Sequence, residues 1–270
     1  MGTIRLTIAY DGGQFSGWQI QPDRRTVQGV VEEAIRELTG ESVRVFSAGR
    51  TDAGVHALGQ VAHFHSNFRI PPEKWRPALQ SRLPDDVVIL ESAAADDEFH
   101  ATFSATQKRY RYIIRLSLVE DPLLRRYAWR MNGSLDLDAM RSAAQSLLGQ
   151  HDFRCFESDW PNKATSVRTI FDVSLTAVSR WPGWGTAPLA EQPPHQNNGE
   201  FVVFEISGDG FLYNMVRAIV GTLVNVGRGK WPVESLARII AGQDRSLAGE
   251  TAPAHGLYLV SVDYGGTMTG

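Results

Sequence analysis

One acidic residue, Asp52, lies in a run of small residues that could hold a reacting group. The run SAGRTDAGVHALGQ extends from Ser47 to Gln60, and Arg50 stands two positions before the aspartate. A turn aspartate often serves only the backbone, because its carboxylate accepts hydrogen bonds from nearby amides. In a partly desolvated pocket an ionised carboxylate can instead attack carbon, provided that a positive neighbour keeps it charged. The run by itself leaves both interpretations open.

Arg217 is a second candidate for chemistry. It lies in GDGFLYNMVRAIVG and is the only charged residue between Phe211 and Val226. An unpaired buried charge is costly, so an arginine on an apolar helix usually has an acidic partner or a ligand. The alternative is that its long side chain carries the charge out to solvent.

A third candidate region is both basic and aromatic. The chain carries a formal net charge of −3, yet seven bases and two acids stand between His100 and Arg130. The bases are Lys108, Arg109, Arg111, Arg115, Arg125, Arg126 and Arg130. Tyr110 lies among them, and a tyrosine on a basic strand can stack on a nucleobase. The segment predicts a surface for phosphates and bases or, alternatively, an ordinary solvated strand face.

Several other kinds of site are disfavoured. The three histidines of HALGQVAHFH lack an HExxH motif and neighbouring thiols, so no metal site is expected. The glycine-containing runs match neither a P-loop nor GxGxxG, and no cofactor is expected. The single cysteine, Cys155, excludes an intrachain disulfide and favours a reducing, cytoplasmic setting. No apolar run approaches the roughly 20 residues of a membrane span.

The elements that must position these residues follow from hydrophobic periodicity. In the first part of the chain, strands are predicted at 3–9, 42–47, 60–65 and 87–90, with helices from Thr26 to Gly40 and from Pro72 to Leu83. In the second part, strands are predicted at 108–116, 167–178, 200–207 and 257–262, with helices at 137–148, 211–226 and 231–241. The segment 180–199 is rich in Pro, Gly and Asn and is predicted to be an exposed hairpin insertion.

These elements predict an α+β fold. Its two halves, residues 1–103 and 104–265, are expected to carry mainly antiparallel sheets and to meet at a central catalytic cleft. The Asp52 run falls in the first half, and the basic aromatic strand and the Arg217 helix fall in the second. No internal repeat is visible in the sequence.

Taken together, these motifs resemble the bacterial tRNA pseudouridine synthases that act on the anticodon stem. The matching blocks are YDGGQFSGWQIQ, GRTDAGVHALGQVAHF, FHATFSATQKRYRYII, GDGFLYNMVRAIVGTLVNVGRGK and APAHGLYLVSV. They follow one another in the family's order and span residues 8 to about 262. Two departures exist: Thr102 stands where the family usually has arginine, and the 180–199 segment is longer than expected.

The resemblance implies a function and a role for each candidate residue. Uridine at tRNA positions 38 to 40 would be isomerised to pseudouridine by breaking the C1′–N1 bond and rejoining the uracil through C5. Asp52 matches the catalytic aspartate and Arg217 the arginine paired with it. Tyr110 matches the tyrosine that stacks on the target uracil, and Arg50 the arginine that helps to displace it. The resemblance further implies a homodimer that binds tRNA, without metal, cofactor or membrane.

Other functions stay open at this point. The chain could be a pseudouridine synthase for another uridine, or an RNA-binding module without catalysis. A small-molecule hydrolase using Asp52 is disfavoured by the basic aromatic strand and by the lack of a second acid near the aspartate.

Overall fold

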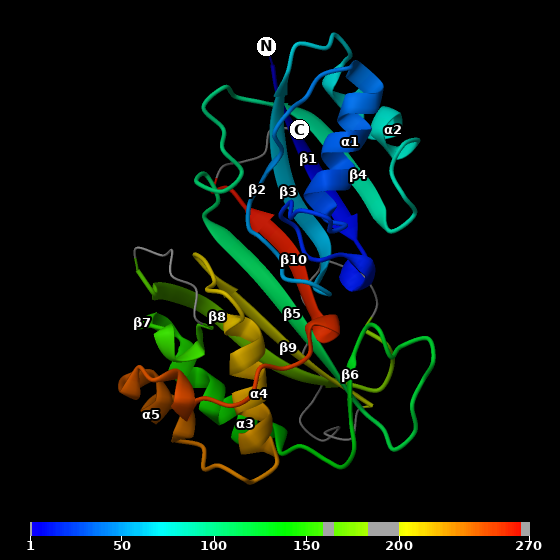
Figure 1. Ribbon diagram of the computed structural model, residues 1–270. Helices are drawn as coiled ribbons and strands as arrows, with labels where there is room; N and C mark the ends of the chain where they lie inside the picture. Colours follow the sequence, from blue (N-terminus) through cyan, green and yellow to red (C-terminus); the bar gives the residue numbers. More distant parts are fainter. Residues whose placement is uncertain (1, 159–164, 183–199, 266–270) are drawn as a thin grey trace. The chain divides into compact units, whose positions relative to one another are not determined.

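The chain folds into two compact units. The structure, a computed structural model, describes residues 2–158, 165–182 and 200–265. One unit comprises Met1–Lys108 with Tyr258–Gly270, and the other comprises Arg109–Leu257 (Figure 1). The final strand therefore belongs to the first unit, whereas the boundaries expected from the sequence placed residues 104–265 in the second.

The first unit is built on a sheet in the order β4-β1-β3-β10. Its strands are β1 (Gly2–Tyr10), β3 (His56–Ser66), β4 (Val87–Ala95) and β10 (Leu257–Asp263), with the short β2 (Phe46–Ser47) paired to β3. Strand β1 runs antiparallel to both β3 and β4. Strand β10 runs parallel to β3, with Tyr258 opposite His56. The end of the chain thus completes the sheet that its beginning starts.

Two helices accompany this sheet in Figure 1, α1 (Val27–Thr39) and α2 (Trp75–Gln80). Helix α1 begins because the Thr26 side chain accepts from the amide of Gly29, and it ends because Gly40 adopts φ 77°, the left-handed conformation. Trp75 of α2 is fully buried and packs edge-on against Phe64 of β3, with ring centroids 5.0 Å apart. The core of the unit lies between these helices and the sheet.

The second unit has a sheet in the order β5-β9-β8-β7. These strands are β5 (Gln107–Leu116), β9 (Phe201–Gly208), β8 (Val167–Val178) and β7 (Gly149–Asp152), and β6 (Trp129–Met131) pairs parallel to β5. Strand β9 is buried along its whole length, as expected for a strand inside a sheet whose faces are covered.

The described residues of this unit form three α-helices: α3 (Leu137–Ala144), α4 (Met215–Gly227) and α5 (Ser235–Gly242). Helix α4 is apolar nearly all round and is buried. Gly227 allows α4 to approach α3 closely, because a Cβ there would lie 2.5 Å from the sulfur of Met140. None of the helices in the described parts of the chain is long and apolar enough to cross a membrane.

The expected α+β class with a mainly antiparallel sheet is confirmed. Several bounds differ. The helix expected at 72–83 is a 3-10 turn (Pro72–Lys74) followed by α2, and the one expected from 211 begins at Met215. The strand expected at 42–47 is only two residues long, and β6 and β7 were not foreseen. The hairpin expected at 180–199 lies almost entirely outside the described residues.

Candidate active site

Asp52 lies in a tight turn between β2 and β3 of the first unit. The amide of Val55 donates to the carbonyl oxygen of Asp52 at 3.1 Å, which closes the turn. Gly54 takes φ 79°, a conformation that favours glycine. Thr51 and Val55 on either side are buried, and Asp52 itself is half-buried. The carboxylate is therefore carried on a fixed backbone at the edge of solvent.

The loop after β1 holds the Asp52 turn from outside. It includes a 3-10 turn at Gly12–Gln14. The amide of Trp18 donates to Thr51 O at 3.0 Å, and the amide of Gly54 donates to Phe15 O at 3.3 Å. Gly17 has φ 91°, and a Cβ there would lie 2.7 Å from Thr51 O. Only glycine permits this approach, so the DGGQFSGW run supports the turn rather than binding a phosphate.

Two side chains connect the ends of the turn to β1 and to the loop that follows it. The Tyr10 hydroxyl lies 2.7 Å from Thr51 Oγ1, and burial raises the pKa of Tyr10 to about 12. This phenol is therefore neutral at physiological pH. Nδ1 of the buried His56 lies 3.1 Å from both the Gly12 amide nitrogen and Asp11 Oδ1. The sequence analysis did not assign this supporting role to Tyr10, Thr51 or His56. Their position inside the motifs YDGG and GRTDAGVHA could have indicated it.

Arg50 is exposed, two residues before Asp52. The carbonyl before it, Gly49 O, accepts from Gln60 Nε2 at 2.7 Å and from Ser47 Oγ at 3.2 Å. Gln60 is fully buried. The backbone is thus fixed while the guanidinium reaches into solvent, which suits contact with a ligand more than a structural role.

Tyr110 lies on β5 in the second unit. Its side chain is 7% exposed and packs edge-on against Phe211, with ring centroids 5.0 Å apart. Tyr112, two residues further, is fully buried, and its hydroxyl donates to Pro253 O at 2.8 Å. Both tyrosines are buried, and Tyr110 keeps slightly more exposure than Tyr112.

Arg217 lies in the first turn of α4 and is half-buried. Its Nε donates to Ala252 O and its Nη1 to Asn214 Oδ1, both at 2.7 Å. Asn214 adopts φ 62° and donates through Nδ2 to Ser158 Oγ at 2.9 Å. The guanidinium is thus oriented by hydrogen bonds rather than extended freely into solvent. Its pairing with Asp52, which lies in the other unit, stays a prediction.

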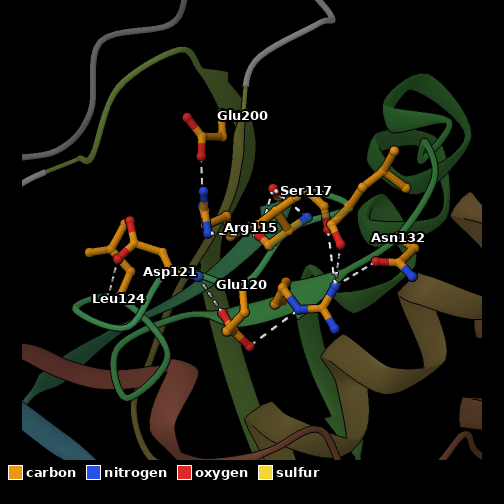
Figure 2. A network of polar contacts seen from close by, with 10 residues as sticks. Arg115, Ser117, Glu120, Asp121, Leu124, Asn132 and Glu200 are labelled. Carbon is orange, nitrogen blue, oxygen red and sulfur yellow. Dashed lines mark hydrogen bonds and ion pairs between the residues drawn. The ribbon is translucent and has the colours of Figure 1, made fainter.

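The basic segment is less positive in the fold than along the chain. Arg111 is 1% exposed and forms an ion pair with Glu205, with the Nη2–Oε1 distance 2.9 Å. Arg115 pairs with Glu200 at 2.6 Å, and Arg130 pairs with Glu120 at 3.2 Å (Figure 2). The interpretation of all seven bases as one phosphate-binding surface is therefore corrected. Acids from outside the segment neutralise two of the bases, and Arg111 is part of the core.

Other candidate chemistries find little support within the described parts of the chain. No group of three or more His, Cys, Asp or Glu residues there could hold a metal ion. Burial raises the pKa of the Cys155 thiol to about 12, so the thiolate form needed for nucleophilic attack is absent at neutral pH. Asp52 is left as the reactive group favoured by its setting.

A family model described as tRNA pseudouridine synthase matches residues 6–104 and 143–265. These ranges include Asp52, Arg50 and Arg217, and Tyr110 lies between them. Among solved structures, the crystal structure of the archaeal box H/ACA sRNP Nop10-Cbf5 complex aligns with 82% of this chain. It is 12% identical, has a TM-score of 0.32, and the alignment spans 53% of that chain.

Curated relatives match nearly the full length. The tRNA pseudouridine synthase A of Acetivibrio thermocellus is 47% identical over 98% of this chain and 100% of its own length. The proteins of the same name from Brevibacillus brevis and Shouchella clausii are 45% and 43% identical, covering 98% of this chain and 100% and 94% of their own lengths. The family that the sequence motifs resemble is thereby confirmed: the chain belongs to the tRNA pseudouridine synthases.

Proposed function

We propose that the protein isomerises uridine to pseudouridine at positions 38 to 40 of the tRNA anticodon stem-loop, with Asp52 as the catalytic residue. The observation that carries this proposal is the setting of Asp52. A half-buried carboxylate stands on a turn closed by its own backbone and fixed from outside through Thr51 and Gly54. Catalysis by a positioned group requires such a fixed backbone.

The reaction needs no second substrate. The C1′–N1 glycosidic bond breaks, the uracil turns, a C1′–C5 bond forms, and the hydrogen at C5 is lost to solvent while N1 gains a proton. Asp52 can serve by adding to the uracil ring or by assisting loss of the C2′ proton. Either role requires the ionised carboxylate.

Three further residues receive roles in this proposal. Arg217 keeps Asp52 ionised, and Tyr110 stacks on the uracil. Arg50, exposed beside the turn, occupies the space that the displaced nucleotide leaves. A base inside a helix cannot be reached by a catalytic group, so the nucleotide must leave the stack.

The protein is further proposed to act as a homodimer in the cytoplasm. Reaching three neighbouring uridines with one Asp52 requires the RNA to shift along the protein. Contacts to backbone and shape allow that movement, whereas contacts to base sequence do not. A dimer supplies such contacts if one subunit holds the tRNA body while the other presents Asp52 and Tyr110.

Release of tritium from tRNA labelled at C5 of uridine tests the catalytic claim. Asp52→Asn is expected to fold and to bind tRNA but to release no tritium. Asp85→Asn, which changes an exposed aspartate of the same unit, is the matched control and is expected to behave as wild type. Near-wild-type release by Asp52→Asn would remove Asp52 from the mechanism. Binding of tRNA by wild type without release would favour the non-catalytic RNA-binding module.

The positional claim has its own test. Carbodiimide modification and primer extension would map pseudouridine on tRNAs with uridine placed singly at position 38, 39 or 40. Modification at all three positions is expected. Modification at one position only, or outside this arm, would favour a synthase with another uridine target.

A further inference from the structure

Three aromatic rings, those of Phe46, His100 and Phe103, form a cluster on the surface of the first unit, in which the Phe46 ring is tilted by 51° against His100. The rings of His100 and Phe103 are stacked with centroids 4.3 Å apart and planes 29° from parallel. The Phe46 ring lies 5.4 Å from that of His100. Phe103 is 83% exposed and Phe46 is 39% exposed. We call these three rings the aromatic platform.

The exposure of Phe103 does not come from a loosely held loop. His63 Nδ1 accepts from the amide of Ala101 at 3.1 Å, and His100 Nδ1 accepts from the amide of Thr102 at 3.2 Å. The Ser104 amide donates to His100 O at 2.9 Å. The turn is therefore fixed by buried and half-buried groups on its inner side, and it presents a large apolar ring to water on its outer side.

The platform is connected to the catalytic turn through β2. Thr102 Oγ1 donates to Ser47 O at 2.6 Å, which joins the platform turn to the strand that leads to Arg50 and Asp52. Asp52 is six positions after Phe46, so their Cα atoms are at most about 22 Å apart. Thr102, which replaces the usual family arginine, has a structural role here.

The charges near the platform decide what it can bind. Asp96, Asp97 and Glu98 are exposed just before the platform turn. These acids weaken the binding of phosphates at this edge, so a contact with RNA here would depend on stacking rather than on ion pairs. Every base has a flat face that stacks on an aromatic ring, whatever its sequence.

We infer that the aromatic platform, with Phe103 outermost, stacks an unpaired base of the substrate tRNA near the uridine at Asp52. This inference rests on the proposed function. It assigns Phe103 as a positioning residue that holds the RNA while the target nucleotide leaves its stack.

Fluorescence of 2-aminopurine tests the stacking directly. The probe is an anticodon stem-loop that lacks uridine at positions 38 to 40 and carries 2-aminopurine singly at each loop position. Wild type is expected to quench at least one position, and Phe103→Trp is expected to retain that quenching. Phe103→Ala and Phe103→Leu are expected to lose it and to bind about 5- to 100-fold more weakly. The leucine variant separates ring stacking from simple apolar contact.

Activity on full-length tRNA provides the second measurement. Phe103→Ala is expected to lower kcat/KM by a similar factor, with most of the loss in KM. Phe171→Ala, which removes a phenylalanine that is 50% exposed on β8, is the control and is expected to leave it unchanged. Thermal unfolding should show the same Tm for Phe103→Ala and wild type.

Three results would overturn the inference. They are wild-type quenching by Phe103→Ala, wild-type quenching by Phe103→Leu, and a loss of subunit association in Phe103→Ala with quenching intact, which would make the platform a protein interface. A failure of the proposed function looks different. Wild type would then form no pseudouridine, while quenching that depends on Phe103 would still establish the platform as an RNA contact.

Discussion

Arg217 is positioned by groups of its own unit, and these contacts determine the effects that we expect from its substitution. The guanidinium donates to Ala252 O and Asn214 Oδ1 through two different nitrogens. A lysine has one ammonium group and cannot reproduce this planar arrangement. The charge and the orientation of residue 217 can therefore be tested separately.

Arg217→Ala is expected to lower kcat by about 100-fold or more, because a fixed charge at the reacting group would be lost. The Kd for tRNA should change far less, and Arg217→Lys should recover part of the rate. Single-turnover tritium release and filter binding measure the two quantities. Wild-type turnover by Arg217→Ala would show that Asp52 needs no help from this arginine.

His63 links the platform turn to pH. Burial, together with the nearby His100 and His65, lowers the pKa of His63 from 6.5 to about 4. The unfolded chain therefore takes up this proton at a higher pH than the folded chain does. The stability that the neutral imidazole contributes is complete above pH 6.5 and is lost as the pH falls towards 4.

We expect the free energy of unfolding to fall by at most about 3 kcal/mol from this group across that range. Urea unfolding of wild type and His63→Asn at pH 7.5, 5.5 and 4.5 measures the loss. The asparagine keeps an acceptor for the Ala101 amide but does not titrate, so its stability should depend less on pH. Equal pH dependence of the two proteins would contradict the expectation.

At the scale of elements, the loop after β1 acts as an external support for the catalytic turn. Gly17 and Gly40 both adopt positive φ, 91° and 77°, but their surroundings differ. A Cβ on Gly17 would lie 2.7 Å from Thr51 O, whereas a Cβ on Gly40 would meet nothing within 4 Å. Alanine substitutions at these two glycines therefore separate the cost of a positive φ from the cost of the steric contact with Thr51 O.

Gly40→Ala is expected to cost about 1–2 kcal/mol of stability, the usual penalty of the left-handed conformation, and to retain activity. Gly17→Ala should cost more and should also lower kcat, because Thr51 must move and Asp52 moves with it. Tritium release and urea unfolding on the two variants provide the measurements. Full activity in Gly17→Ala would show that the loop does not position the turn.

The local signals in the sequence predicted most elements of this fold. Thr26 and Gly40 bound α1 as their capping chemistry requires, and the alternating apolar residues of β1 form a strand. Strand β7 was not foreseen, since GQHD has no alternating apolar residues. In the site, Asp52 stood out through its neighbours in sequence. Arg111 was misread as a surface base because its partner, Glu205, lies 94 residues away.

At the scale of the whole molecule, the net charge of −3 conceals an uneven distribution. Arg111, Arg115 and Arg130 are neutralised by acids, while Arg125 is exposed on the loop between β5 and β6. Binding to tRNA should still weaken steeply with salt, because each phosphate contact releases counterions. The fold predicts that the exposed basic side chains, and not the buried Arg111, determine the salt dependence of tRNA binding.

Arg125→Gln is expected to reduce the slope of log K against log salt by about 1. Arg36→Gln, which changes an exposed arginine paired with Glu33 on α1, should leave the slope unchanged. Titrations of labelled tRNA at KCl concentrations from roughly 50 to 300 mM measure the slope for both variants. No salt dependence in wild type would contradict a phosphate-binding surface.

The parallel pairing of β10 with β3 has a consequence for biosynthesis. Ser66 ends β3 and Leu257 begins β10, so about 190 residues are translated between them. At about 5–20 residues per second this takes about 10 to 40 s. During that time β3 lacks its parallel neighbour, and His56 lacks the ring of Tyr258, on which it stacks with centroids 4.9 Å apart. The unit that carries Asp52 is thus begun first and completed last, so a nascent chain should complete the sheet beneath its catalytic turn only after the second unit has been made.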